Sequence, residues 1–453
     1  MNIPIDIWSR LLIAACMLQT ACDDELGELE EPDLEAVEPR SVSTVSSSTS
    51  DEHPLSWASG TKVVVASSGI HAVYHDVGYI KYTTSTNGIN WTFPPALAGG
   101  ANNSAAAASQ PTIAVAGDGT IGVAYRKNQG EIRYMFKPPN GTWFPSFKIT
   151  ADASSGPGGV VEPSIVAFGN TMHLTWSKSS SVYYASFPAT QSTPLATAER
   201  VDHDAACGGS AANNHPAIAI SGHSAVDPTA RVRVAFFDRG NNCPDDFFAI
   251  TVAERQSNGS WQYVREQTFP AAESWSISHA AIPATGDFYV AVSYQQGSVG
   301  KTEIWYENAW SNDTWRSAAV FDEMSYVDIS AKIVGCVPTL RYALNYPFGA
   351  PGPQLGSSYG GYGQTFYRTG RWTGAQAAAP TWSDPNPILI DTDGSTPEAL
   401  FFRKSDGNNI RDVPVVYARW IPGGGKTIAE ATTTVPEDPS LDVLQQVPCK
   451  KNF

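Results

Sequence analysis

Arginine, histidine and carboxylate side chains gather in the turns of this 453-residue chain, between short segments rich in aromatic residues. The candidates for ligand binding are Arg126, Asp238, Arg239, His203, His215, Tyr294 and Arg403. An arginine can hold a carboxylate through two parallel hydrogen bonds, and a histidine can change its charge near neutral pH. The set therefore favours a polar ligand that carries negative charge. Ion pairing of Asp238 and Arg239 with neighbouring loops is the alternative, purely structural interpretation.

Three kinds of carbohydrate site could use such residues. A glycoside hydrolase needs two carboxylates across a sugar bond, one of them protonated. A polysaccharide lyase needs a histidine or tyrosine base and an arginine that offsets the uronate carboxylate. A lectin needs only aromatic platforms and hydrogen-bonding polar groups. The carboxylates available for the first chemistry are Asp76, Glu162, Asp238, Glu273 and Glu323.

The elements that must position these side chains are short antiparallel strands. Residues 109–149 show two-residue alternation in three or four short runs, separated by turns at Gly117-Asp118-Gly119 and Asn140-Gly141. Such a four-stranded sheet has two apolar faces, so it needs copies of itself on either side. Helical periodicity is nearly absent from the chain.

The copies recur at intervals of about 50 to 60 residues, the range of propeller repeats. An aromatic or large apolar residue followed by a polar turn marks each second strand, at Tyr74, Tyr125, Trp176, Phe237, Tyr294, near Leu344 and at Phe402. The start of each first strand also repeats, as Gln110-Pro111, Glu162-Pro163 and His215-Pro216. Residues 56–433 are therefore predicted to form an all-β, closed β-propeller of four-stranded blades, with seven blades preferred over six.

In a propeller, the loops that open the first strands share one face with the turns between second and third strands. The candidate residues would then surround the mouth of the central channel, beside the inserted loops 201–214, 241–246 and 347–364. The chain has no Walker, His-Glu-x-x-His or Cys-x-x-Cys motif. Recognition of carbohydrate, with an acidic glycan preferred, is the favoured function. A glycoside hydrolase or polysaccharide lyase with its site at the channel mouth is the alternative.

The turn from Thr84 to Trp91 resembles the Asp-box of sialidase-like (BNR-type) propellers, with Thr86 at the family's Asp position. This resemblance implies a fold and no chemistry. Sialidases also carry an early Arg-Ile-Pro, which is absent here, so sialidase activity is not expected.

Residues 1–21 have the pattern of a signal peptide, with an apolar run too short to span a bilayer. Ala21-Cys22 resembles the lipobox of bacterial lipoproteins, which implies lipidation of Cys22 and a membrane contact through that anchor alone. Residues 22–55 hold eleven acidic residues against one arginine and are rich in Ser and Thr, which predicts a disordered tether. The expected location is the cell envelope, at the periplasm or cell surface, with secretion after ordinary cleavage as the alternative.

With Cys16 removed and Cys22 removed or acylated, four cysteines remain, an even number that suits an oxidising compartment. The disulfide candidates are Cys207, Cys243, Cys336 and Cys449, whose pairing the sequence leaves open. Asp391 and Asp393 could bind calcium, although a plain turn is favoured, and no other cofactor is expected. Residues 434–453 form a C-terminal tail. Since no basic stripe exists, no nucleic-acid partner is expected. The protein is expected to be a monomer.

Overall fold

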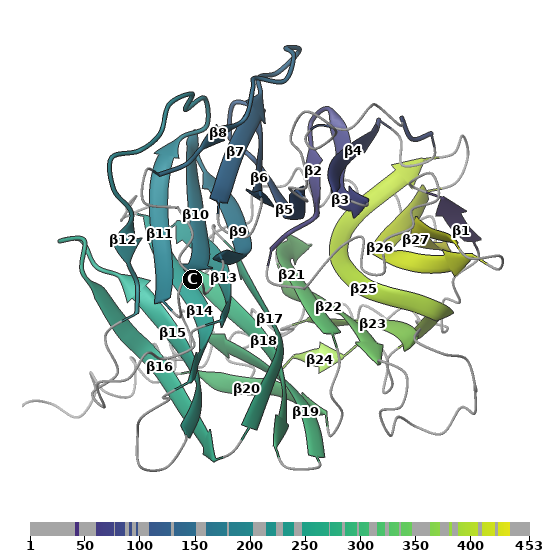
Figure 1. Ribbon diagram of the computed structural model, residues 1–453. Coiled ribbons are helices and arrows are strands. Elements are labelled where there is room, and N and C mark those ends of the chain that lie inside the picture. Colours follow the sequence, from purple (N-terminus) through teal and green to yellow (C-terminus); the bar gives the residue numbers. More distant parts are fainter. Residues whose placement is uncertain are drawn as a thin grey trace, which may run out of the picture. The chain divides into compact units, whose positions relative to one another are not determined.

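The computed structural model describes residues 41–44, 60–76, 78–86, 90–92, 97, 108–127, 131–150, 160–178, 181–202, 214–222, 230–239, 247–270, 272–282, 286–296, 299–307, 315–321, 326–334, 337–346, 363–371, 380–382, 388–405, 410–421 and 425–434. All of these ranges belong to one compact unit, residues 38–453. Each described element is a β-strand, and the strands form six antiparallel sheets (Figure 1). Within these ranges, no helix is long and apolar enough to cross a membrane.

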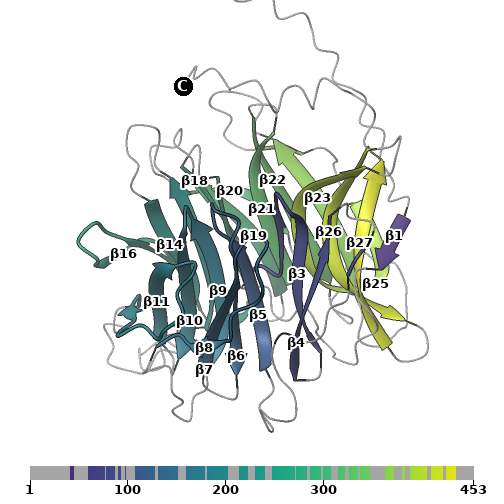
Figure 2. The ribbon, with the colours of Figure 1, turned by 90° about the horizontal axis from the view of Figure 1, so that it is seen from above.

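The first five sheets follow one another along the chain, and in each of them consecutive strands pair (Figure 2). The first sheet contains β2 (Val63–Ala66), β3 (Gly69–Asp76) and β4 (Tyr79–Ser85). The second contains β5 (Ala108–Val115), β6 (Ile121–Lys127), β7 (Glu131–Lys137) and β8 (Phe147–Lys148). The third contains β9 (Val160–Phe168), β10 (Thr171–Lys178), β11 (Ser181–Pro188) and β12 (Glu199–Arg200). The fourth contains β13 (Asn214–Gly222), β14 (Ala230–Arg239), β15 (Phe247–Arg255) and β16 (Trp261–Pro270). The fifth contains β17 (Ala272–Ile282), β18 (Asp287–Gln296), β19 (Val299–Glu307) and β20 (Arg316–Phe321).

The sixth sheet has eight strands. They are β1 (Ser41–Thr44), β21 (Tyr326–Val334), β22 (Val337–Tyr346), β23 (Gly363–Arg371), β24 (Thr381–Trp382), β25 (Ile388–Ser405), β26 (Ile410–Ile421) and β27 (Gly425–Thr434). β24 pairs only with Gly370 and Arg371 at the end of β23, so most of that edge is open to another strand. The long strand β25 pairs there, between Gly363 and Tyr367.

This pairing corrects the predicted number of blades. The segments expected to form a sixth and a seventh blade share one sheet, so the structure has six blades and the preference for seven was wrong. Among the described residues, no strand of the first sheet pairs with a strand of the sixth, and closure of the propeller stays a prediction. β1 lies inside the segment expected to be a disordered tether, and it pairs with β27 from Ser41 to Thr44.

The second to fifth sheets bury apolar side chains from both faces, because each packs between two neighbours. One apolar cluster joins the second and third sheets through Tyr134 and Trp176, and another joins the fourth and fifth through Phe237 and Tyr294. Further clusters join the first sheet to the second, the third to the fourth and the fifth to the sixth. The expected packing of similar sheets on either side is therefore found for the second to fifth sheets.

The first strands of neighbouring sheets lie side by side and are joined by side-chain hydroxyls. The Ile165 N–H donates to Thr112 Oγ1 at 3.4 Å, and the Ile218 N–H donates to Ser164 Oγ at 3.3 Å. The Val327 N–H donates to Ser276 Oγ at 3.2 Å. The paired residues are separated by 53, 54 and 51 positions, which agrees with the repeat length predicted from the aromatic residues.

Candidate functional site

Antiparallel pairing brings the start of each first strand beside the end of the second strand. Ser109 pairs with Arg126 in the second sheet, and Val160 pairs with Lys178 in the third. In the fifth sheet Ala272 pairs with Gln296. We call this side of the sheets the opening end. It contains both kinds of loop from which the candidate residues were drawn.

Three residues at the opening end have a backbone conformation that is unusual for residues other than glycine. Gln110, Glu162 and His215 have φ values of 51°, 55° and 56°. Each directly precedes a proline and coincides with a shift in strand register. A proline further restricts the residue before it, and a left-handed conformation of this kind costs about 1–3 kcal/mol. The same costly conformation thus recurs at one equivalent position in three successive sheets.

The side chains of these residues link the three sheets. The Glu162 N–H donates to Gln110 Oε1 at 3.1 Å. In the next sheet, His215 Nδ1 lies 2.5 Å from Glu162 Oε2. The Glu162 side chain is 3% exposed and that of His215 is 17% exposed, so solvent screens their charges only weakly. The His215 ring also meets the Phe237 ring edge-on, with 5.8 Å between centroids.

Arg126, at the end of β6, completes this group, which we call the Glu162 cluster: Gln110, Arg126, Glu162 and His215. Burial lowers the pKa of Arg126, and the nearby Glu162 carboxylate acts in the opposite direction. Burial likewise acts to lower the pKa of His215, but the charge and hydrogen bond of Glu162 outweigh it, so this pKa is raised. Two cations can therefore lie near one carboxylate, and the cluster has a net positive charge whenever His215 is protonated.

Asp238 is not part of the Glu162 cluster, although it is also at the opening end. Its side chain is buried, and Oδ1 has no hydrogen-bond partner among the described residues. Burial, together with the nearby charges of Glu266 and Asp202, raises the pKa of Asp238 to about 6. This carboxyl group can therefore change its protonation state in mildly acidic solution.

The other predicted residues do not join the cluster in the described part of the chain. Arg239 ends β14 and Arg403 lies in β25, but their side chains are outside the described residues, as is all of His203. Tyr294 is buried between the fourth and fifth sheets, and its hydroxyl donates to Glu303 Oε1 at 2.6 Å. A ring that is buried in this way cannot serve as a sugar platform, so we leave Tyr294 out of the proposed site.

The predicted metal, disulfide and lipid sites are largely outside the described residues. Cys22, Cys207, Cys243, Cys336 and Cys449 all lie there. The backbones of Asp391 and Asp393 belong to β25, whereas their side chains are not described. In the part of the chain that is described, no group of three or more His, Cys, Asp or Glu residues could hold a metal ion.

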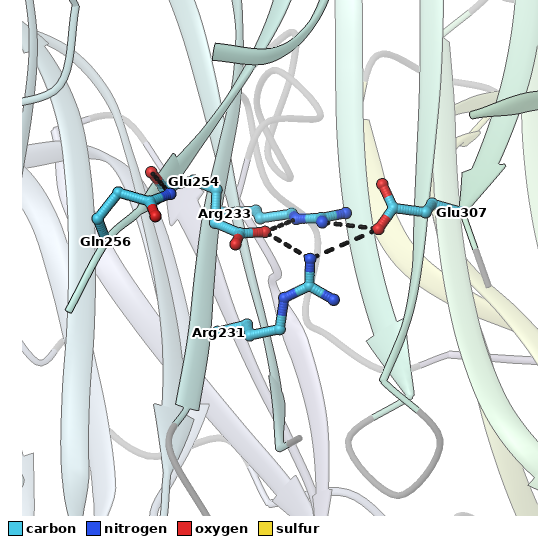
Figure 3. Close-up of polar contacts among 5 residues, drawn as sticks. All are labelled: Arg231, Arg233, Glu254, Gln256 and Glu307. Atoms are coloured by element: carbon cyan, nitrogen blue, oxygen red, sulfur yellow. Dashed lines mark hydrogen bonds and ion pairs between the residues drawn. The ribbon is translucent and has the colours of Figure 1, made fainter. Parts of the chain in front are cut away.

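A second polar cluster, between the fourth and fifth sheets, was not predicted from the sequence. Arg233 Nε donates to Glu254 Oε2 at 2.6 Å, and Arg233 Nη2 donates to Glu307 Oε1 at 2.7 Å (Figure 3). Arg231 contacts the same two carboxylates at 2.8 and 3.5 Å. The Arg233 guanidinium also lies 4.1 Å from the centroid of the Phe288 ring. This cluster joins two sheets through matched charges, which gives it a structural role.

One sequence signal could have identified the Glu162 cluster more fully. The repeat of a polar residue before proline, at Gln110, Glu162 and His215, was visible as a strand signature. The unusual backbone conformation of these three residues, and the contacts that they make between sheets, could not be predicted from the sequence. Nothing in the local pattern marked Arg231 and Arg233, because they form part of an ordinary alternating strand.

No protein family and no characterised protein matches this sequence. Among solved structures, the chain is similar to the BP39L lectin from Burkholderia pseudomallei, with 13% identity, a TM-score of 0.51, and coverage of 82% of this chain and 98% of that one. A variant of the Aleuria aurantia lectin, in complex with Fucα1-6GlcNAc, has 14% identity, a TM-score of 0.38 and coverage of 73% and 98%. An endo-arabinase from Bacteroides thetaiotaomicron has 11% identity, a TM-score of 0.36 and coverage of 57% and 96%. The first similarity supports the propeller fold. The sialidase-like resemblance stays a prediction.

Proposed function

We propose that this chain is a β-propeller that recognises carbohydrate at the opening end of its second to fourth sheets, and that it prefers an acidic sugar to a neutral one. The observation that carries the proposal is the Glu162 cluster. Its backbone holds a costly conformation at the same position of three sheets, and such conformations concentrate at functional sites.

The charge of the cluster supports the acidic preference. Arg126 is half-buried beside Glu162, and Glu162 also contacts His215. A ligand carboxylate that approaches the opening end would meet two cationic groups and one carboxylate that already has partners. Arginine is suited to this task because its planar group can bind a carboxylate with two hydrogen bonds.

The fold is compatible with this role. BP39L is a lectin, and its structure aligns over most of both chains. At 13% identity, the comparison supports the scaffold and leaves the ligand to be argued from this chain's own residues. The acidic sugar is therefore proposed from the charges of the Glu162 cluster alone.

An enzyme remains the second candidate because of Asp238. A glycoside hydrolase needs a carboxylic acid that stays protonated near its working pH, and the pKa of Asp238 is raised to about 6. Glu162 is at the same end of the sheets and could supply the second carboxylate. Asp238→Asn would abolish sugar release if Asp238 is the acid, and would leave binding by a lectin nearly unchanged.

The proposed cellular setting is export followed by anchoring through a lipid on Cys22. Cys22→Ala protein, expressed in a bacterial host and partitioned between detergent and aqueous phases, should move to the aqueous phase. If it stays in the detergent phase with the natural protein, the anchor proposal fails.

The function itself is tested by glycan-array binding together with an assay for new reducing ends and unsaturated products. Binding to acidic glycans without any product supports the lectin. Arg126→Ala should weaken that binding at least tenfold while leaving the melting temperature nearly unchanged, because the side chain is only half-buried. Lys81→Ala, at a partly exposed position in β4, is the matched control. An array without signal would reject carbohydrate recognition.

A further inference from the structure

We infer that the Glu162–His215 pair makes binding of an acidic sugar depend on pH, because His215 is a second cation for the sugar carboxylate only while it is protonated. The inference rests on the proposed carbohydrate site. It adds a specific role for His215, and it predicts that the acidic sugar is released when the pH rises.

The geometry fixes which atom of His215 can meet a ligand. Nδ1 is in contact with Glu162 Oε2, so any contact with a ligand must come from the other ring nitrogen, Nε2. The ring is also held by the edge-on contact with Phe237. The contacts with Glu162 and Phe237 together define the orientation of the ring.

Glu162 is held equally firmly. Its side chain is almost fully buried, its backbone N–H donates to Gln110, and its backbone conformation is set by Pro163 and by the bulge. Because Glu162 belongs to the third sheet and His215 to the fourth, their contact also depends on the packing of those sheets. Titration of His215 can therefore change the charge at the site without rearranging the strands.

The charged groups at this end come from four strands of three neighbouring sheets. Arg126 and Lys127 are the last two residues of β6, Glu162 lies in β9, Lys178 ends β10 and Asp238 lies in β14. Arginine and lysine keep their charge through the neutral pH range. With His215 protonated, the Glu162 carboxylate is near two cations, Arg126 and His215. With His215 neutral, Glu162 and Arg126 balance one another, and the attraction for a further carboxylate falls.

The sign of the pH effect follows from the contacts. The pKa of His215 is raised above its usual 6.5, so the cation persists at and somewhat above that pH. Above the raised pKa, affinity for an acidic sugar should fall by up to about tenfold per pH unit, since one proton is linked to binding. Loss of the Asp238 proton near pH 6 acts in the same direction, so variants must separate the two groups.

The experiment measures binding of a panel of uronate-containing and neutral glycans at about pH 6 and about pH 8.5. The natural protein should bind uronate glycans more tightly at the lower pH. His215→Gln keeps a hydrogen-bonding group toward Glu162 but cannot be protonated, so it should bind weakly at both pH values. Glu162→Gln removes the charge that supports the cation and should shift the pH dependence toward acid. His75→Gln, at the opening end of the first sheet, is the matched control and should leave the profile unchanged.

Each outcome decides between the inference and the proposed function. Uronate binding that is equal at both pH values, or whose pH dependence is as large in His215→Gln as in the natural protein, overturns the inference and leaves the lectin proposal standing. Absence of binding to any glycan overturns both. If His215→Gln does not fold, as judged by its melting transition, the inference is tested by Glu162→Gln alone. An unshifted pH dependence of uronate binding in that variant would contradict the inference.

Discussion

The hydroxyl of Tyr134, in the second sheet, donates a 2.6 Å hydrogen bond to the backbone carbonyl of Ala189, which follows the third strand of the next sheet. The ring reaches this position by passing over Gly122. A Cβ atom at residue 122 would lie 2.6 Å from the Tyr134 hydroxyl and 2.8 Å from Met172 Cε. Absence of a side chain in one sheet therefore permits a bond between two sheets.

Gly122→Ala should lower the free energy of unfolding by about 1–3 kcal/mol, because the added methyl group overfills a packed interface. Urea denaturation measures the loss. Tyr134→Phe removes the hydroxyl and should cost about 1 kcal/mol alone, but much less when residue 122 is alanine. Additive effects of the two changes would contradict the steric explanation.

Ser164→Ala should lower the free energy of unfolding by about 1–3 kcal/mol, because the buried N–H of Ile218 loses its acceptor. Ser276→Ala should behave in the same way through Val327. The exposed Ser192 provides a control, since its replacement by alanine should have little effect. Equal stability of Ser164→Ala and Ser192→Ala would show that the hydroxyls do not join the first strands.

Arg233→Met should be among the more destabilising changes, at about 3–5 kcal/mol, because Glu307 would keep a buried charge without its main partner. Arg231→Met should cost clearly less, since that side chain is 21% exposed and Arg233 would still hold both carboxylates. Adding Glu307→Gln to Arg233→Met should recover part of the loss. No recovery in the double variant would mean that packing against Phe288, and not charge pairing, explains the effect.

His173 should make the protein less stable in acid. Burial lowers the pKa of His173 to about 4, and its Nδ1 lies 2.7 Å from the Tyr184 hydroxyl. A group whose pKa is lower in the folded state contributes stability above its unfolded pKa of about 6.5 and loses it as the pH falls toward 4. His173→Gln should therefore have a smaller fall in the free energy of unfolding across this window than the natural protein.

The comparison with His173→Gln is needed because other groups titrate in the same range. His71 behaves like His173, with burial lowering its pKa to about 4. Asp238 and Asp328 act in the opposite sense, because burial raises each pKa to about 6 and protonation then favours the folded state. Identical pH profiles for the natural protein and His173→Gln would remove His173 from this account.

The strands could be predicted because their signal is local. Tyr125, Trp176, Phe237 and Tyr294 were expected in second strands, and all four lie there, each about 1% exposed. Alternation and turn residues determine such positions within a few residues of sequence. The number of blades, in contrast, is not determined by a local sequence signal. It depends on β25 pairing with the open edge of β23, and edge pairing leaves no mark in the sequence of either strand.

The strand positions of two candidate residues were predictable in the same way. Arg126 and His215 were assigned to one end of the sheets from the repeat, and antiparallel pairing places both at that end. Their connection through Glu162 depends on the lateral packing of the second, third and fourth sheets. That packing could not be derived from the sequence repeat. The repeat predicts the strands within each sheet, but it does not predict how closely one sheet packs against the next.

The pairing of β1 with β27 has a consequence for how the chain is made. Ser41 pairs with Thr432, so the segment synthesised early must wait for nearly all of the intervening chain before it finds its partner strand. Contacts between such distant residues slow folding because the connecting loop must first be closed. During that delay the exposed backbone of residues 41–44 could pair with a strand of another molecule, and the outer edge of β27 is equally unprotected. Rapid synthesis of this protein should therefore favour strand pairing between different molecules. Slow synthesis should favour pairing of β1 with β27 within one chain.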